Sequence, residues 1–296
     1  MDKLQWDLMQ MCKRNRDGAY ATQAARERSL DLCARQLREM GFNQLRAHSL
    51  KPKHVEALVR RWLGGDARFP GERRLAAATV KNRLAHLRWW AEKSGRLSVV
   101  PEDNTLLGVE RRSYVRAEGR QLALDADKLV AIADERIRLS LLLQAQFGLR
   151  REESIKFQPS YAVQDGEIRL KPSWAKGGRA RTVPVLTADQ RWVLGEVRRV
   201  AGGGSLIPPD KTYAEHLKAY EGAVLQAGIS KAHGLRHAYA QRRYEALTGW
   251  KAPHAGGPKS NELSPAQRLA DRAARLAVSA ELGHAREEVT AVYLGR

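Results

Sequence analysis

The spacing of apolar residues in the first hundred positions limits this part of the chain to packed helices. Over residues 24–40 the apolar side chains recur every three or four positions, which places them on one face of a helix; they are Leu30, Cys33, Leu37 and Met40. A second helix is predicted over residues 52–63, with proline in its first turn. A third is predicted over residues 79–93, with Thr79 as its N-cap. Its apolar stripe consists of Val80, Leu84, Leu87 and Ala91.

The helical pattern stops at residues 99–120. Pro101 and the polar residues after it end the periodicity, and four arginines follow with few apolar neighbours. We therefore expect a helical domain over residues 1–100, a basic linker over 101–121 and a second domain over 122–296. In the second domain, the apolar stretch 137–147 predicts a buried helix. Asp165-Gly166 predicts a hairpin between strands at 161–163 and 167–170, with a further strand at 181–185. The fold class expected is mainly α with a small antiparallel sheet, the second domain being α+β.

The charge of the chain points to a polyanionic partner. The 296 residues include 52 Lys and Arg against 33 Asp and Glu, a formal net charge of +19. Residues 1–120 carry 25 basic and 14 acidic side chains, and residues 121–296 carry 27 and 19, so the excess is not confined to a tail. A globule that is positive in both halves repels itself unless an anion such as nucleic acid neutralises it. The alternative is a soluble basic protein with no such partner.

Other functional classes are disfavoured by composition. Two cysteines, Cys12 and Cys33, cannot build a disulfide framework, or a four-ligand zinc site without several histidines close by. No apolar stretch is long enough to span a bilayer, and the N-terminus lacks the core of a signal peptide. We expect no metal, no cofactor and no membrane association, and a cytoplasmic protein.

Four short groups of residues combine basic and nucleophilic side chains, and each has an ordinary structural explanation when taken alone. The first ends an apolar helix, where Arg often binds terminal carbonyls. The second is a basic turn between strands. The third holds His and Arg three residues apart, neighbours on one helix face. The fourth is followed after nine residues by Tyr293, and a tyrosine between apolar neighbours is commonly a half-buried packing residue. The groups are Gly148–Glu153, Lys176–Arg179, His233–His237 and Leu282–His284.

Taken in order along the chain, these groups resemble the tyrosine recombinase (phage integrase) family, and the resemblance covers nearly the whole chain. Three segments are most similar to integrase-domain proteins of bacterial integrative elements. They are FGLRREE (residues 147–153), SWAKGGRARTVPV (173–185) and HGLRH (233–237). The resemblance implies a SAM-like core-binding domain followed by a catalytic domain. It also implies that duplex DNA is cut and rejoined through a 3′-phosphotyrosine bond.

The resemblance assigns roles by position. Tyr293 corresponds to the nucleophile, and Arg150 and Arg236 correspond to the two arginines that bind the scissile phosphate. Guanidinium forks suit a phosphate whose oxygens gain charge during attack. His233 corresponds to the first histidine, which can accept or help remove the tyrosine proton. Lys176 corresponds to the hairpin lysine, which we assign as the general acid for the leaving 5′-oxygen.

Further positions follow from the same resemblance. His284 fills the position held by His or Trp and is expected to hydrogen-bond a non-bridging oxygen. Glu153 falls on the acidic position three residues after the first arginine and is expected to orient its neighbours. The stretch 78–88 is similar to a recurrent DNA-facing helix, which implies DNA contacts in that region and at the hairpin. The DNA-binding residues predicted are Arg74, Lys81, Arg83, Arg88 and Arg179.

The partners implied are double-stranded DNA, a homotetramer on paired sites, and accessory DNA-bending or directionality proteins, in a bacterial nucleoid. Two other functions stay open: a type IB topoisomerase, and a DNA-binding accessory protein that does not cut. The target sequence and the direction of the reaction are not encoded in any pattern we can interpret.

Three features depart from the family pattern. His284 lies 48 residues after Arg236, and the excess falls in residues 248–265, either a binding loop or a tolerated surface loop. Only three residues follow Tyr293, so exchange of a further C-terminal helix between subunits is unsupported. The pair Glu287-Glu288 has no assigned role.

Overall fold

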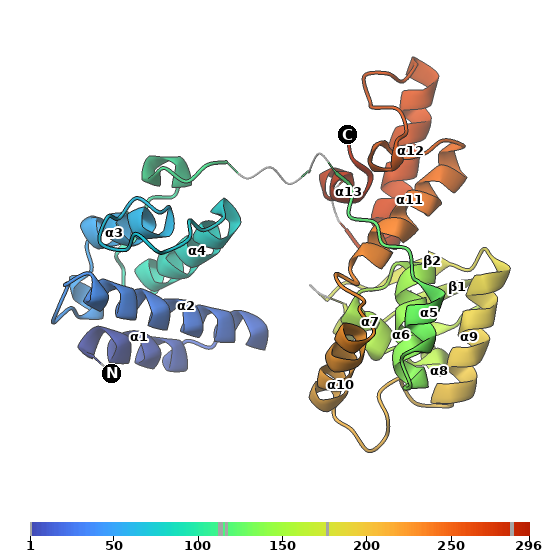
Figure 1. Cartoon of the computed structure of the whole chain (residues 1–296), viewed down its shortest axis with the longest axis horizontal. Helices are drawn as coiled ribbons and strands as arrows, with labels where there is room; N and C mark the ends of the chain where they lie inside the picture. The colour runs from blue at the N-terminus through green and yellow to red at the C-terminus, as the bar shows by residue number, and fades with distance from the viewer. Residues whose placement is uncertain (1, 112–114, 116–117, 176–177, 285–286) are drawn as a thin grey trace. The chain divides into compact units, whose positions relative to one another are not determined.

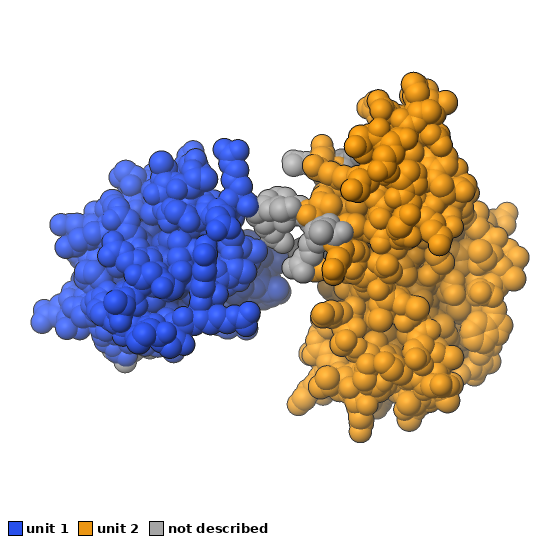
Figure 2. Space-filling model, turned by 45° about the horizontal axis from the view of Figure 1, so that its top comes forward, with its two compact units in different colours: residues 1–113 blue, residues 114–296 orange. Residues whose placement is uncertain are grey.

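The computed structural model describes residues 2–111, 115, 118–175, 178–284 and 287–296. The chain forms two compact units, Met1–Ser113 and Tyr114–Arg296, shown in blue and orange in Figure 2. Both units are mostly helical, and the described residues include a two-stranded antiparallel sheet in the second unit. The predicted fold class is confirmed. Within the described ranges, no helix is both long and apolar enough to cross a membrane.

The first unit is a group of helices around one apolar core. The apolar face predicted over residues 24–40 is buried, and so is the apolar stripe predicted over residues 79–93. Trp62 and Trp90 fill the centre of this core and are almost fully buried. The elements are α1 (Lys3–Arg14), α2 (Tyr20–Glu39), η1 (Ala47–Ser49), α3 (Pro52–Trp62), α4 (Ala77–Lys93), η2 (Leu97–Val99) and η3 (Asn104–Leu107).

The prediction that Thr79 caps the third of the expected helices is wrong. That helix, α4, begins at Ala77, and its N-cap is Ala76, which makes no side-chain capping bond. The backbone N–H of Leu75 donates to the carbonyl of Trp62 over 2.8 Å and fixes the chain just before the helix. Alanines then favour helix at once, so Thr79 falls inside the first turn.

The segment predicted as a linker, 101–121, is divided between the two units. Its first part folds in the first unit, where Asp103 caps η3 and Val109 is buried in the core. Its last residues belong to the second unit, which begins at Tyr114, and Gln121 Oε1 accepts from Gln241 Nε2 over 3.4 Å.

The second unit is built around α6. Leu139, Leu143 and Phe147 on one side of α6 join one apolar cluster, and Ile137 and Leu141 on the other side join another. α9 packs on α6 and beside the sheet, and α11 and α12 lie side by side with α13 against them (Figure 1). The prediction that the helix over residues 137–147, now α6, is buried on most sides is confirmed. The elements before the sheet are α5 (Ala126–Val130), α6 (Glu135–Phe147), α7 (Arg151–Ile155) and α8 (Pro159–Ala162). The sheet and the elements after it are β1 (Glu167–Leu170), η4 (Pro172–Trp174), β2 (Arg181–Pro184), α9 (Ala188–Ala201), α10 (Tyr213–Gln226), α11 (Gly234–Thr248), η5 (Pro253–Ala255), α12 (Pro265–Glu281) and α13 (Glu287–Leu294).

The sheet is not the predicted three-strand arrangement. β1 pairs with β2 in antiparallel register, with Ile168 opposite Val183. The expected strand at 161–163 is instead the helical turn α8 followed by a single bridge from Val163 to Ile168. Pro159 at the first helical position favours the turn, because its fixed φ suits a helix and its missing N–H costs nothing there.

Candidate active site

Arg150 lies at the corner between α6 and α7. Gly148 caps α6 in the left-handed region (φ 61°), and a Cβ at this position would lie 2.4 Å from the ring of Tyr239. Only glycine allows both the turn and the close approach. Arg150 is then the N-cap of α7, and its N–H donates to Glu153 Oε2 over 2.6 Å. The Arg150 side chain keeps 22% of its surface exposed, so its guanidinium can meet a ligand.

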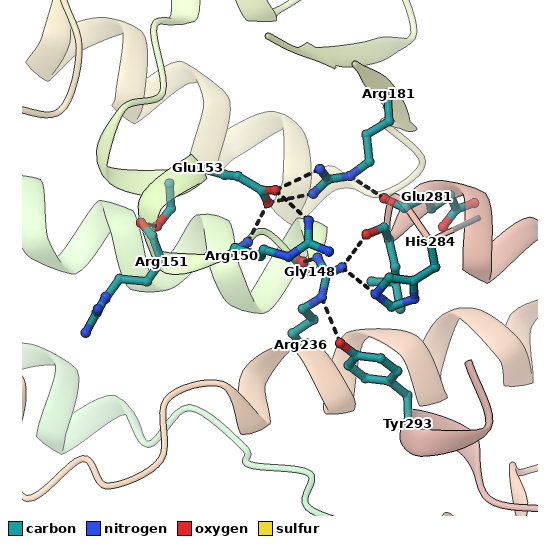
Figure 3. A network of polar contacts seen from close by, with 11 residues as sticks. Gly148, Arg150, Arg151, Glu153, Arg181, Arg236, Glu281, His284 and Tyr293 are labelled. Carbon is teal, nitrogen blue, oxygen red and sulfur yellow. Dashed lines mark hydrogen bonds and ion pairs between the residues drawn. The ribbon is translucent and has the colours of Figure 1, made fainter. Parts of the chain in front are cut away.

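Glu153 is a fully buried carboxylate that binds two arginines (Figure 3). Its Oε1 accepts from Arg150 Nη1 and from Arg181 Nη1, both over 2.8 Å, and its Oε2 accepts from Arg181 Nη2 over 2.6 Å. Burial alone would raise the pKa of Glu153, but the hydrogen bonds and charge of Arg181, together with those of Arg150, outweigh it and lower the pKa to about 2. Glu153 is therefore ionised, and its hydrogen bonds fix the position of Arg150. The role predicted for it in the reaction stays a prediction.

Arg181 is a site residue that the sequence analysis missed. It begins β2 and is buried on the same face of that strand as Val183, while Thr182 between them is exposed. Its Nε donates to the carbonyl of Glu281 over 2.8 Å. The signal was available in the period-two alternation of the predicted strand, which places an arginine on the apolar face. Such a residue needs a buried partner.

Arg236, in the first turn of α11, is 1% exposed and is the most buried of the predicted arginines. Its Nη1 and Nη2 donate to the carbonyls of Gly148 and Leu282, and its Nη2 also lies 3.4 Å from His284 Nε2. Burial lowers the pKa of Arg236 to about 10; Tyr293 opposes this shift, and the charges of Arg150 and Arg181 add to it. Arg236 therefore stays protonated at neutral pH. This arginine joins the corner that carries Arg150 to the segment that carries His284.

Tyr293 on α13 points its hydroxyl at Arg236, with Oη 3.4 Å from Nε (Figure 3). Three imidazoles surround its ring: His284 is stacked at 5.3 Å between centroids, His237 lies at 4.5 Å and His233 at 6.1 Å. Residues predicted from four separate parts of the sequence therefore meet at one place. His237, four residues after His233 and so on the same helix face, was not predicted as part of the site.

The backbone around Tyr293 is held by its own chain. The carbonyl of Tyr293 accepts from Gln241 Nε2 over 3.0 Å and lies 3.4 Å from His254 Nδ1. The carbonyl of Gly295 accepts from Arg275 Nη1 over 2.9 Å. His254 belongs to η5, so part of the 248–265 segment packs against the C-terminal helix.

The three imidazoles are neutral at neutral pH. Burial first, and then the charges of Arg236 and Arg150, lower the pKa of His284 to about 3 and that of His233 below its usual range. Burial first, and then His233 and Arg120, lower the pKa of His237 to about 4. A neutral imidazole can accept a proton, which a charged one cannot.

Two hairpin residues complete the predicted set. Lys176 lies outside the described residues. Arg179 is exposed just before β2.

The arginines predicted to bind DNA in the first unit already have protein partners. Arg88 donates to the carbonyl of Pro101 over 2.9 Å through Nε and to Asn104 Oδ1 over 2.7 Å through Nη2, so its guanidinium binds the segment that carries η3; its contact with DNA stays a prediction. Arg74 pairs with Glu110 over 3.0 Å on the surface.

Two further DNA-binding candidates lie on α4. The Arg83 guanidinium stacks over the Trp62 ring, 5.0 Å from its centroid. Burial lowers the pKa of Arg83. Lys81, half-buried on the same helix, has no ion pair within 4.0 Å among the described residues.

Within the part of the chain that the structure describes, no three His, Cys, Asp or Glu side chains form a group able to hold a metal ion.

Comparisons with known proteins match both units. Residues 1–100 match the family described as "Phage integrase, N-terminal", and residues 113–242 match the family described as "Integrase". The chain belongs to the tyrosine recombinase family. It is a DNA strand-transferring enzyme of the phage integrase class, as the sequence analysis predicted. The second match ends before His284 and Tyr293, and the folded structure brings these two residues to the others.

Solved recombinase structures share the fold. The XerH site-specific recombinase bound to palindromic difH substrate superimposes with a TM-score of 0.58 at 16% identity, over 99% of this chain and 81% of that one. A lambda integrase dimer bound to a COC′ core site gives 0.60 at 17% identity, over 99% and 78%. The Tn1549 transposon integrase with circular intermediate DNA gives 0.56 at 14%, over 100% and 96%. No curated protein sequence matches the chain.

Proposed function

We propose that this recombinase cuts and rejoins duplex DNA at specific sites by attack of Tyr293 on a backbone phosphate. The proposal depends on one observation: the Tyr293 hydroxyl lies 3.4 Å from Arg236 in a cluster of three guanidinium groups and one carboxylate. The excess positive charge suits an anion, and the phenol oxygen lies beside it.

The first chemical step forms one bond and breaks one. Tyr293 Oη attacks phosphorus, the phosphorus–5′-oxygen bond breaks, and the product is a 3′-phosphotyrosine with a free 5′-hydroxyl. The phenol proton goes to His233, whose burial keeps it neutral and able to accept. His284, neutral for the same reason, bonds a non-bridging oxygen of the phosphate.

The arginines stabilise the charge that attack adds to the phosphate oxygens. Arg150 does so from the exposed corner of α7 and Arg236 from beneath the tyrosine. Donors that are already fixed in place need no reorganisation during the reaction, and in many enzymes they supply most of the rate enhancement.

The leaving 5′-oxygen needs a proton. We assign it to Lys176 from its position in the sequence between η4 and β2. The phosphotyrosine bond retains the free energy of the phosphodiester, so the hydroxyl of a second strand can reverse the reaction without ATP.

We assign the attack to the site of the tyrosine's own subunit, because Gln241 on α11, Arg275 on α12 and His254 on η5 hold the backbone around Tyr293 beside Arg236.

The partners follow from the reaction and the relatives. A pocket of about 930 Å³ opens beside His233 and is lined by Arg120 and Lys231 among others, which suits the flanking DNA backbone. Lambda integrase forms a tetramer on a Holliday junction in one solved structure, and we propose a homotetramer on paired sites here. Accessory DNA-bending or directionality proteins would set the direction, and the work would take place on the bacterial nucleoid.

The test begins with the DNA that becomes covalently trapped on the protein in cells, whose sequence supplies the site. A nicked suicide duplex carrying that site is then incubated with wild type and with Tyr293→Phe. Wild type should become attached to the 3′ side, and the variant should bind the duplex but not attach. Attachment by both or by neither would refute the assignment. Relaxation of a plasmid without the site would favour a topoisomerase instead.

A further inference from the structure

Arg181 is a buried arginine of the site, and the proposed chemistry gives it no role. Its side chain is 5% exposed. Its three described hydrogen bonds go to the two carboxylate oxygens of Glu153 and to the backbone carbonyl of Glu281. These bonds use both sides of its fork and its Nε, and they hold the guanidinium between the Glu153 carboxylate and the end of α12.

The charges around Glu153 show what Arg181 changes. Glu153 is fully buried and carries a negative charge, and a buried carboxylate needs a cation. Arg181 supplies that cation through a bidentate pair, the stronger geometry for arginine and carboxylate. Arg150 donates to the same carboxylate through a single side-chain nitrogen and keeps part of its surface exposed. With Glu153 neutralised by Arg181, the charge of Arg150 remains available to a ligand.

Arg181 also ties together segments that carry other site residues. Its bond to Glu281 reaches the end of α12, three residues before His284. Gly283 packs so closely against the Arg181 side chain that a Cβ at this glycine would lie 2.8 Å from Arg181 Cδ. The next carbonyl, that of Leu282, accepts from Arg236. The buried Arg181 guanidinium therefore links β2 to α7 and to the turn before His284.

We propose that Arg181 is a positioning residue that neutralises Glu153 and so leaves the charge of Arg150 free for the scissile phosphate. The inference rests on the proposed function. Without Arg181, Arg150 would be the sole cation bonded to Glu153, and its charge would be cancelled inside the protein.

The test measures covalent attachment to the suicide duplex at saturating DNA, together with DNA affinity and thermal unfolding. Arg181→Ala should slow attachment about 10²–10³-fold, the range found when one charge-stabilising donor is lost, while affinity changes less than about tenfold. Adding Glu153→Gln to Arg181→Ala removes the carboxylate that cancels the charge of Arg150 and should recover at least about tenfold of the rate. Arg181→Lys keeps the charge without the fork, should fall between wild type and Arg181→Ala, and serves if the alanine variant does not fold.

A second substrate separates positioning from a loss of structure. When a neutral methylphosphonate replaces the scissile phosphate, the charge of Arg150 matters less, so the defect of Arg181→Ala or Arg181→Lys should shrink at least about tenfold. An equal defect on both substrates without rescue by Glu153→Gln, or a wild-type rate in Arg181→Ala, would overturn the inference.

The control removes a comparable buried arginine from the other unit. Arg61 is also 5% exposed and pairs with Glu39 and Glu72. Arg61→Ala should lower the unfolding temperature but leave attachment at saturating DNA within about threefold of wild type. If wild type itself forms no adduct, the proposed function fails. If wild type reacts and only the Arg181 pattern is absent, the inference alone fails.

Discussion

The two units both bury arginines, but they balance the charge differently. In the first unit, Arg61 lies between two carboxylates, Glu39 and Glu72, and its guanidinium also stacks 3.7 Å from the centroid of the Phe69 ring. In the second unit, three arginines gather around one carboxylate. Arg150 and Arg181 bind Glu153, and Arg236 binds only backbone carbonyls and site side chains.

The difference separates arginines that support the fold from arginines that serve chemistry. A buried cation with enough carboxylates is satisfied by the protein. A cluster with more cations than carboxylates has charge left for an anion from outside. Under the proposed function, the surplus cations of the second unit bind the scissile phosphate, and the first unit contributes to DNA binding through its surface.

The largest effect that tests this comparison is on cleavage. Arg150→Ala removes an unbalanced charge from the second unit and should reduce covalent attachment by about 10³-fold. Duplex affinity should stay within about tenfold, because most affinity comes from many dispersed phosphate contacts. Attachment rates at saturating DNA and a binding titration on the same duplex measure the two quantities. Arg236→Ala should reduce covalent attachment by a factor similar to that of Arg150→Ala. A loss of binding as large as the loss of cleavage would contradict the separation.

The next effect is the dependence of stability on pH. The pKa values of about 3 for His284 and about 4 for His237 lie below the ordinary value, so at pH 5 the unfolded chain takes up about two protons that the folded chain does not. Stability should therefore fall as pH drops from about 6.5 toward 4, by about 2–3 kcal/mol per pH unit near pH 5. Glu153, whose pKa is about 2 in the folded protein, also stabilises the fold at pH values above the ordinary pKa of a glutamate. This stabilisation is lost as the pH falls toward 2.

Denaturant unfolding at several pH values measures this slope. His237→Gln should reduce the slope near pH 5 by about one proton. An unchanged slope in that variant would mean that the imidazole beside Tyr293 is not held neutral by the fold.

The smallest effects compare two residues of α4. Arg88→Ala removes bonds that hold η3 and should cost about 1–3 kcal/mol of stability. Lys81→Ala should leave stability within about 0.5 kcal/mol but reduce the salt dependence of DNA binding by about one phosphate contact. Chemical denaturation and binding titrations over a range of salt concentrations check both. If Arg88→Ala altered only the salt slope, its assignment to the fold would be wrong.

Much of this protein is determined locally, and that part is predictable from sequence. The inward faces of α2 and α4 follow from residues three and four apart. The pairing of Arg150 with Glu153 follows from a spacing of three residues at the start of a helix. Local preferences also explain the two wrong predictions. Alanines before Thr79 start α4 earlier than predicted, and Pro159 favours a helical turn where a strand was predicted over 161–163.

Tertiary structure alone decided which side chains meet and which charges remain unbalanced. Arg181 reaches Glu153 across 28 residues, and Arg236 reaches Tyr293 across 57. His237 became part of the site only when α13 folded over α11. The sequence supplies arginines of the same kind in both units. Whether each is neutralised depends on which carboxylates the fold brings within hydrogen-bonding distance, because a buried ion pair is a short-range contact with no fixed separation along the chain.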